Sequence, residues 1–295
     1  MRTRWRATVV SATRHVAPRL AVVGTCNVDL VVRCQRLARP GETVLGDDVV
    51  RLAGGKGANQ AVAAVHLDAH VTLMATLGDD DSGRWLYESL RGHGVDVSLV
   101  QWSARPTGTA FITVDDTGEN EIVVSLGANR DLDLGHVDLG VFDVVLAQME
   151  VATAVIDDVV ARSRRCIVNV VPSAGVNHET LSRCAVVIAN EIESESLDVA
   201  ALEHVVVTLG SGGAVHYQRG REVARASALD VEPVDTVGAG DVFCAAYAVQ
   251  FARGASAQDA LSFAAAAGSL ATLALGAQGA LPTFDEVRSW LARTS

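Results

Sequence analysis

Short apolar runs, each followed by glycine or polar residues, recur along the chain and alternate with segments of helical periodicity. Runs of Val, Ile, Leu and Ala of this length are typical of strands that are buried on both faces of a sheet. Strands are predicted at 20–24, 71–75, 142–147, 166–171, 185–189 and 205–209, and helices at 56–66, 82–91, 153–164, 239–253 and 256–275. This alternation predicts an α/β fold, a parallel sheet covered by helices on both faces.

A second pattern interrupts this alternation. Residues 42–50, 97–103, 109–115 and 120–125 alternate in polarity or are rich in β-branched side chains, and Asp116-Thr117-Gly118 forms a turn signal. The pattern predicts a small antiparallel sheet with strands from about 42–50 and 97–126, inserted into the α/β body. Such a sheet is suited to act as a lid over a binding site or as a clasp between two subunits.

The length fits one large domain, which we place at residues 18–295 of the 295. The first seventeen residues are rich in arginine and contain no acidic residue, so we expect 1–17 to be a disordered extension. The longest apolar stretch, 264–275, is too short to span a membrane.

Charge and cysteine content exclude further classes. The chain has 24 basic and 35 acidic residues, a net charge of −11 that disfavours general binding to nucleic acid. Its five cysteines are an odd number with no C-x-x-C pair, which favours reduced thiols and a cytoplasmic location.

The motif with the clearest chemistry is Asp235-Thr-Val-Gly-Ala-Gly-Asp241, which leads directly into a predicted helix. Glycines before a helix allow backbone N–H groups to converge on an anion, and the helix dipole adds to the attraction. A carboxylate in the first turn often only caps the helix. Together with three small residues just before it, however, Asp241 suits phosphoryl transfer, in which it would accept the proton of an attacking hydroxyl.

A second glycine-rich segment, Gly54-Gly-Lys-Gly-Ala-Asn59, contains Lys56, the only lysine of the chain. It is not a Walker A loop, because Val50 stands where that pattern needs glycine and Gly57 follows the lysine. Consecutive glycines let the backbone approach a small polar ligand, and Asn59 can both donate and accept hydrogen bonds to a sugar. A tight turn with a locally satisfied asparagine explains this segment alone equally well.

Polar residues also follow most of the predicted strands. Asn27 and Asp29 follow the first strand, where an Asx-rich turn is an equal alternative; the other polar groups at strand ends are Glu150, Asn190 to Glu193, and Thr208 to Gly213. Ligands bind outside the carboxyl ends of the strands in open α/β sheets. Several such groups at one sheet edge therefore predict a binding site there.

Other catalytic patterns are missing from the sequence. His66 and His70 lack the H-E-x-x-H arrangement, Gly238 and Gly240 lack the third glycine of a dinucleotide fingerprint, and there is no G-x-S-x-G elbow. A dinucleotide-linked enzyme, a zinc protease of this type and an α/β-hydrolase are thus disfavoured.

The order of these motifs resembles the PfkB carbohydrate kinase family, and within it the ribokinase branch is most similar. The motifs that carry the resemblance are Gly24-Thr-Cys-Asn-Val-Asp29, Pro40-Gly-Glu-Thr43, Gly54-Gly-Lys-Gly-Ala-Asn-Gln60, Gly78-Asp-Asp80, Asn190-x-x-Glu193, Thr208-Leu-Gly-Ser-Gly-Gly213 and Asp235-Thr-Val-Gly-Ala-Gly-Asp241. The resemblance extends from residue 20 to the C-terminus and implies a ribokinase-like fold.

The resemblance also implies roles for individual residues. Asp241 would be the catalytic base, with Gly238, Ala239 and Gly240 forming the anion hole. The sugar would be bound, together with Asp241, by Asn27, Asp29, Gly55, Lys56, Gly57, Asn59 and Glu150. The ATP side would consist of Asn190, Thr208, Gly210, Ser211, Gly212, Gly213 and Gly240.

Two cations are implied as well. Glu193 would organise Mg²⁺ through water, and K⁺ would be held by Asp235 and by backbone carbonyls at Val237, Ala271, Ala274, Gly276 and Ala280. Dimerisation through the lid strands is a further expectation from the resemblance.

The expected reaction is phosphorylation of D-ribose at O5 by ATP, giving ribose 5-phosphate. The alternatives are another PfkB sugar or nucleoside kinase, such as a deoxyribokinase, and a sugar-binding regulator without turnover. The segment between Asn190 and Thr208 is shorter than in relatives, and Ala265 stands where some ribokinases have a larger polar residue near the adenine. These departures concern the nucleotide side rather than the catalytic groups.

Overall fold

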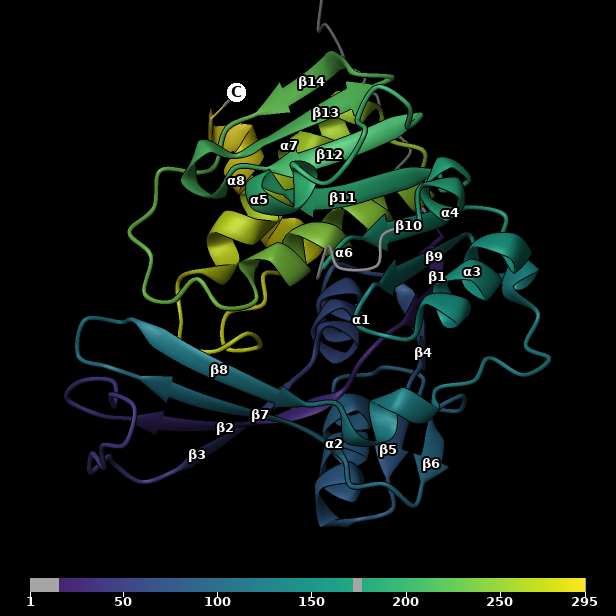
Figure 1. The fold of residues 1–295 in the computed structure, drawn as a ribbon. Helices are drawn as coiled ribbons and strands as arrows, with labels where there is room; N and C mark the ends of the chain where they lie inside the picture. The colour runs from purple at the N-terminus through teal and green to yellow at the C-terminus, as the bar shows by residue number, and fades with distance from the viewer. Residues whose placement is uncertain (1–15, 172–176, 295) are drawn as a thin grey trace, which may run out of the picture.

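The computed structural model describes residues 16–171 and 177–294. Most of the predicted extension 1–17 therefore lies outside the described residues. Figure 1 shows an α/β body with a smaller sheet that projects from it. Within the described part of the chain, no helix is long and apolar enough to cross a membrane.

The body is built on one eight-stranded sheet. Its six strands from β12 to β4 are parallel, and β13 and β14 add an antiparallel edge. Continuous apolar runs form these strands because the parallel part of the sheet is buried on both faces. In spatial order the strands are β14 (Arg221–Ala226), β13 (Ala214–Gln218), β12 (His204–Thr208), β11 (Val186–Asn190), β10 (Cys166–Asn169), β9 (Val144–Gln148), β1 (Arg19–Val23) and β4 (His70–Met74).

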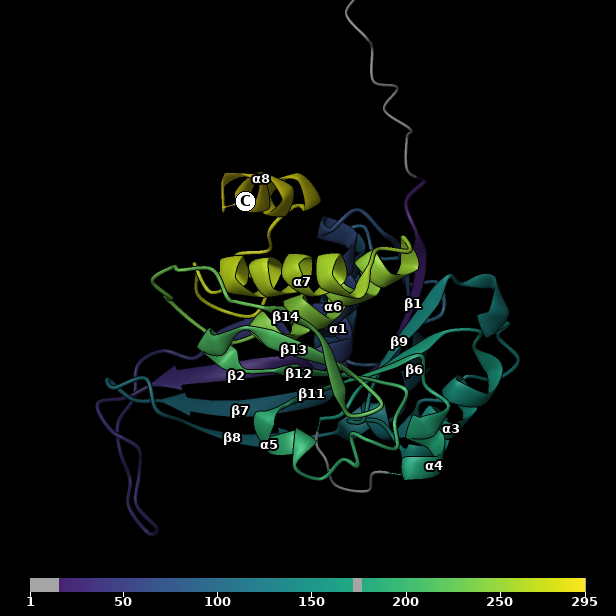
Figure 2. The same ribbon diagram turned by 90° about the horizontal axis from the view of Figure 1, so that it is seen from above.

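Helices cover both faces of this sheet, as Figure 2 shows from above. One face packs on α1 (Lys56–His66), α6 (Ala239–Ala252) and α7 (Ala257–Ala271), with α8 (Phe284–Thr294) outside α7. The other face carries α3 (Thr153–Arg162), α4 (His178–Ser182) and the short α5 (Glu191–Ser194). Alternate strand residues supply the two cores: Val22 and Leu146 face α6, whereas Val23 and Val145 face α3. The predicted fold class is thereby confirmed.

A four-stranded sheet projects from the body below α1 (Figure 1). This projecting sheet has the order β3 (Val50–Gly54), β2 (Asn27–Arg33), β7 (Gly108–Val114) and β8 (Asn120–Ser125). The pair β2 and β7 is parallel and the other two pairs are antiparallel. Beside it lie α2 (Asp81–Gly92) and the two-stranded sheet of β5 (Thr76–Gly78) and β6 (Gln101–Ser103).

Two of the strands predicted for the small sheet are not part of it. Residues 42–49 form no regular strand, since the only pairing there is an isolated bridge between Cys34 and Gly46. Leu45 is 90% exposed in this segment, so its apolar alternation reflects no buried face. In the segment 97–103, only Gln101–Ser103 is a strand, and it pairs with β5 instead of joining the projecting sheet.

The missing strands of the projecting sheet come from elsewhere in the chain. Residues 27–33, interpreted from the sequence only as a polar ligand segment, form the central strand β2, and residues 50–54 form β3. The strand β2 pairs in parallel register with β7, Asn27 opposite Gly108. Because parallel partners are remote in sequence, no local turn signal marks such a strand.

Candidate active site

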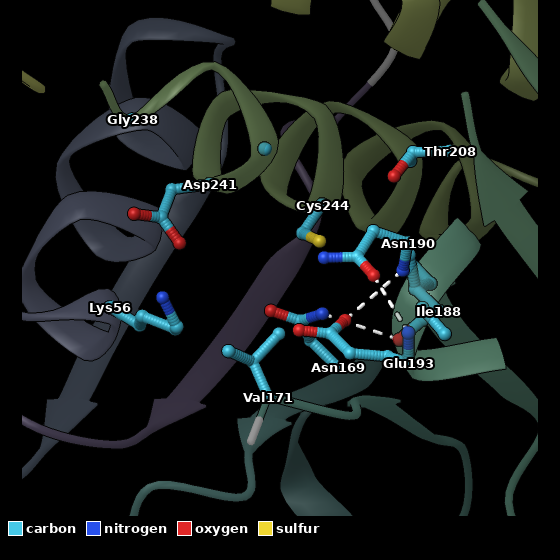
Figure 3. A pocket seen from close by; sticks show the side chains of 12 residues that line it. Lys56, Asn169, Val171, Ile188, Asn190, Glu193, Thr208, Gly238, Asp241 and Cys244 are labelled. Carbon is cyan, nitrogen blue, oxygen red and sulfur yellow. Dashed lines mark hydrogen bonds between the residues drawn. The ribbon is translucent and has the colours of Figure 1, made fainter. Parts of the chain in front are cut away.

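Polar side chains gather at the carboxyl ends of the body strands and at the start of α6 (Figure 3). They surround a cavity of about 200 Å³. Asp241 and Lys56 lie on one side of this cavity, and Asn190 and Glu193 lie on the other. The lining consists of Lys56, Asn169, Val171, Ile188, Ala189, Asn190, Glu193, Thr208, Gly238, Gly240, Asp241 and Cys244.

Asp241 lies in the first turn of α6 and is only 8% exposed. Both of its carboxylate oxygens accept hydrogen bonds: Asn59 Nδ2 donates to Oδ2 at 2.9 Å, and Gln60 Nε2 donates to Oδ1 at 3.0 Å. Burial raises the pKa of Asp241, although the Lys56 charge and these two bonds lower it. A carboxylate with a raised pKa in this position is suited to accept a proton from a bound hydroxyl.

The start of α6 depends on glycine. Gly238 caps the helix with φ of 80°, in the left-handed region, and a Cβ there would lie 2.6 Å from Ala277. Gly240, by contrast, has open space where a Cβ would be, because it faces the cavity. The predicted anion hole is thus a helix N-terminus that is open toward the cavity at Gly240, whereas the Ala239 N–H donates to the Thr236 carbonyl at 3.3 Å.

The loop before α1 lies on the same side of the cavity as Asp241. Gly55 has φ of 89°, and Gly57 packs so closely on the backbone of Gly24 that a Cβ would lie 2.6 Å away. This approach places Lys56 Nζ 3.5 Å from Glu150 Oε1. Burial lowers the pKa of Lys56, but the charges of Asp241 and Glu150 outweigh it, so the net pKa is raised and the ammonium stays charged.

Two residues from β2 complete this side of the site. The carboxylate of Asp29 fills the space beside Gly54, where a Cβ would lie 2.1 Å from Oδ2. Burial, together with the charges of Glu150 and Asp241, raises the pKa of Asp29 to about 6. Asn27 is oriented by Asn129, whose Nδ2 donates to Asn27 Oδ1 at 2.9 Å. The Asn27 amide nitrogen is therefore free to donate to a ligand.

A second cavity of about 350 Å³ adjoins the first, sharing Thr208 and Gly240 with it. It is lined by Gly210, Ser211 and Gly213 of the loop after β12, and by apolar side chains such as Phe243 and Ala265 from α6 and α7. Gly212 belongs to the same short turn but does not line the cavity. A largely apolar cavity beside a helix N-terminus is suited to a nucleotide, with its nucleobase and ribose in the cavity and its phosphates at the helix N-terminus.

The predicted pair Asn190 and Glu193 forms a capping box on α5. Asn190 Oδ1 accepts from the Glu193 N–H at 2.8 Å, and Glu193 Oε2 accepts from the Asn190 N–H at 3.1 Å. Capping of α5 by itself therefore explains why an asparagine and a glutamate stand at these two positions. Both also line the cavity that contains Asp241, and burial raises the pKa of Glu193.

The residues predicted to hold a monovalent cation lie in two neighbouring loops, before α6 and after α7. Asp235 Oδ1 accepts from Val237 N–H at 3.0 Å, and its Oδ2 accepts from Gly276 N–H at 2.8 Å. Ala271 ends α7, and Ala274 and Ala280 belong to the loop that follows. Among the described residues there is no cluster of three or more His, Cys, Asp or Glu side chains that would hold a metal.

Several residues of the site have no role among the predictions made from the sequence. Gln60 contacts Asp241 directly, Thr25 Oγ1 donates to Glu150 Oε2 at 2.5 Å, and Gln278 Nε2 donates to Asn59 Oδ1 at 3.0 Å. For Gln60 a signal existed, since it is a polar residue within the Ala- and Val-rich helix α1. For Asn129 and Gln278 no local signal existed, because their partners lie 102 and 219 positions away.

Comparison with known proteins agrees with this geometry. Residues 17–284 match the pfkB family carbohydrate kinases. The chain is 36% identical over 292 residues to the ribokinase of Bacillus subtilis (strain 168), covering 92% of this chain and 99% of that protein. Two ribokinase structures, each 30% identical and covering 93% of this chain and 99% of theirs, superpose well: that of Thermotoga maritima with a TM-score of 0.86, and that of Arabidopsis thaliana complexed with ribose and ATP with 0.84. This chain therefore belongs to the pfkB family of carbohydrate kinases.

Proposed function

We propose that this chain is a ribokinase, which transfers the γ-phosphoryl group of ATP to O5 of D-ribose and forms ribose 5-phosphate and ADP. The observation that carries the proposal is the position of Asp241. It is a buried carboxylate at a glycine-lined helix N-terminus, facing Lys56 and adjoining the second, largely apolar cavity. The ribokinase relatives extend over nearly the whole chain, which supports the same activity.

The sugar binds on the side of α1 and the projecting sheet in this proposal. Asn27, Asp29, Asn59 and Glu150 supply donors and acceptors for hydroxyls, and the glycines around Lys56 let the backbone approach the ring. Lys56 offsets part of the repulsion that Asp29 experiences from Glu150 and Asp241. Nucleotide binding falls to the second cavity and the loop from Thr208 to Gly213.

In the chemical step, O5 of the sugar attacks the γ-phosphorus, the bond to the β-γ bridging oxygen breaks, and Asp241 takes the O5 proton. The backbone N–H groups of Gly238, Ala239 and Gly240 stabilise the charge on the transferred group. The transition state of phosphoryl transfer is loose, so positioning and electrostatics supply most of the catalysis.

Two cations fit the residues present. Mg²⁺ bound with ATP would neutralise phosphate charge, and Glu193 is suited to orient its water because the carboxylate borders the cavity. Asp235 and the carbonyls of its neighbouring loops offer the oxygen donors that K⁺ prefers. We expect turnover to fall when K⁺ is replaced by a large organic cation, and an unchanged rate would contradict the K⁺ site.

A panel of phosphoryl acceptors assayed with ATP tests the proposal most directly. We expect ADP release with D-ribose to exceed that with 2-deoxyribose or with nucleosides. Preference for 2-deoxyribose would identify a deoxyribokinase instead. Ribose binding by calorimetry without ADP release would identify a sugar-binding regulator, the alternative favoured only by the short segment around α5.

The projecting sheet is proposed to act as the lid of the site and as a dimer clasp. It carries Asn27 and Asp29 at its base, while its outer part exposes apolar side chains. Phe111, Ile122 and Val123 are 52%, 53% and 68% exposed, and β8 leaves one edge of the sheet unpaired. An exposed apolar edge strand of this kind is a site for pairing with a second copy of the chain.

A further inference from the structure

A chain of buried amide side chains lies behind Asp241 and extends from α1 to β11. Gln60 Nε2 donates to Asp241 Oδ1 at 3.0 Å and approaches Asn169 Oδ1 at 3.3 Å. Gln148 Nε2 in turn donates to Gln60 Oε1 at 2.6 Å. Gln60 and Gln148 are both fully buried, whereas Asn169 borders the cavity and is 7% exposed.

The orientation of the Gln60 amide follows from a group that can only accept. The backbone carbonyl of Ile188 accepts from Asn169 Nδ2 at 3.2 Å, so the Asn169 oxygen must face Gln60. Gln60 then has to present its nitrogen to both Asn169 and Asp241, and its own oxygen is left for Gln148. The network therefore points an N–H of Gln60 at the carboxylate.

Gln148 satisfies the buried oxygen of Gln60 but is itself only partly paired. Its Oε1 is buried without a hydrogen-bond partner among the described residues. An apolar side chain at this position would remove the unpaired atom, but it would leave the buried Gln60 Oε1 without its donor Gln148 Nε2, which is also costly. Space is kept for the amide by Gly24, where a Cβ would lie 1.7 Å from Gln148 Oε1.

We propose that Gln60 is a positioning residue for the catalytic base and that Gln148 fixes the Gln60 amide for this task. Gln60 holds the Asp241 carboxylate in one orientation and favours its charged form, so that the second oxygen, shared with Asn59, faces the sugar. The inference rests on the proposed role of Asp241 as the base. Neither glutamine touches the sugar or the nucleotide in this arrangement.

The test compares Gln60→Met and Gln148→Met with the wild-type enzyme, using ribose and ATP. Met retains the length of the side chain and removes its donors. We expect Gln60→Met to lower kcat about 10-fold with little change in the ribose KM, and to move the acid limb of the kcat profile upward by about one pH unit. Gln148→Met should change both quantities in the same direction by a smaller amount, because the Gln60 oxygen then loses its donor while Asn169 still orients the amide.

The pH profile separates positioning from a purely structural role, which would lower the melting temperature without moving the limb. The other titratable groups facing Asp241 are Lys56 on α1, Asp29 on β2, Glu150 after β9, Glu193 on α5 and Cys244 on α6. The side-chain bonds of Gln60 go instead to Asp241, Asn169 and Gln148, so its loss acts directly on Asp241.

Gln250→Met is the matched control, because Gln250 lies near the other end of α6 and lines a separate cavity with Asp68 and Arg253. It should behave as wild type. If the Asp241→Asn variant is active, Asp241 is not the base, and the proposed function loses its catalytic group. A different outcome would overturn only the role of the glutamines. In that outcome Asp241→Asn is inactive, but Gln60→Met and Gln148→Met keep the wild-type kcat and the wild-type acid limb of the pH profile. Should Gln60→Met fail to fold, Gln148→Met decides the question on the same criteria.

Discussion

At the scale of single residues, the site is a balance between burial and a few compensating contacts. Asp29, Glu150 and Asp241 would repel one another without Lys56, the only lysine in a chain of 295 residues. Burial raises the pKa of Asp29 to about 6 and raises that of Asp241, but Lys56 keeps its proton. The result is one fixed positive charge and two carboxylates, Asp29 and Asp241, with increased affinity for protons.

Asp241→Asn removes the group that takes the proton from O5. We expect kcat to fall by roughly 10²-fold or more, since general-base catalysis contributes about that factor. The ribose KM should change little, because asparagine retains the shape and one acceptor oxygen. Steady-state kinetics with ribose and ATP measures both constants, and near-normal turnover would reject the assignment.

Asp29 makes sugar binding sensitive to acid. Because its pKa is raised to about 6, the carboxylate gains a proton as the pH falls through that value and becomes a poorer acceptor for sugar hydroxyls. We therefore expect the ribose KM to rise below about pH 6. The control is Asp29→Asn, which should have a higher KM with no such dependence; a dependence that persists in this variant would assign it to another group.

At the scale of elements, the glycine loops and helix starts form the site, and their shapes follow from steric rules. The helix α6 begins at a left-handed glycine, Gly238, and α1 begins at Gly55, which also has a positive φ. The two helices pack on each other, which brings Asp241 Oδ2 to 2.9 Å from Asn59 Nδ2 on α1. Neither loop would keep its path with a side chain at the close contacts.

Gly238→Ala tests the start of α6. The substitution puts a Cβ 2.6 Å from Ala277 and leaves a non-glycine residue at φ of 80°. Strain of this kind costs about 1–3 kcal/mol, so the melting temperature should fall. We expect kcat to fall at least about tenfold as the N–H groups lose their alignment.

Gly92→Ala is the matched control for that variant, because Gly92 ends α2 without positive φ and has open space around it. It should leave both kcat and thermal stability near the wild-type values. Equal effects of the two substitutions would show that the geometry of Gly238 has no special importance.

At the scale of the whole molecule, the projecting sheet and the body meet at the site. Strand β2 continues from β1 through the residues 24–26, so the chain that supplies the middle of the body sheet also supplies Asn27 and Asp29. The outer half of the projecting sheet has apolar side chains with no covering element in the described chain. Pairing of two such sheets would bury these side chains and tie lid movement to the dimer.

Val123→Lys tests this pairing. A lysine on the exposed strand β8 discourages edge association, so we expect the dimer to dissociate at concentrations where the wild type is dimeric. Light scattering measures the mass of each. Val223→Lys, at another exposed position on the edge strand β14 of the body sheet, should leave the mass unchanged, and a monomeric wild type would contradict the clasp.

The sequence by itself determined the features that depend on neighbours along the chain. Apolar runs and helical periodicity predicted the six parallel strands of the body and the helices α1, α2, α3, α6 and α7, because their signals lie within a few residues, but not the edge strands β13 and β14. The motif from Asp235 to Asp241 predicted the glycine-capped start of α6 for the same reason.

Tertiary structure alone decided which remote segments pair. The segment 42–49 alternates in polarity but forms only an isolated bridge at Gly46, whereas 27–33 is a strand because β7 and β3 pair with it. The orientation of Asp241 likewise depends on Asn59 and Gln60, 182 and 181 positions earlier. Hydrogen bonds between such distant residues depend on the packing of the folded chain, which no local pattern records.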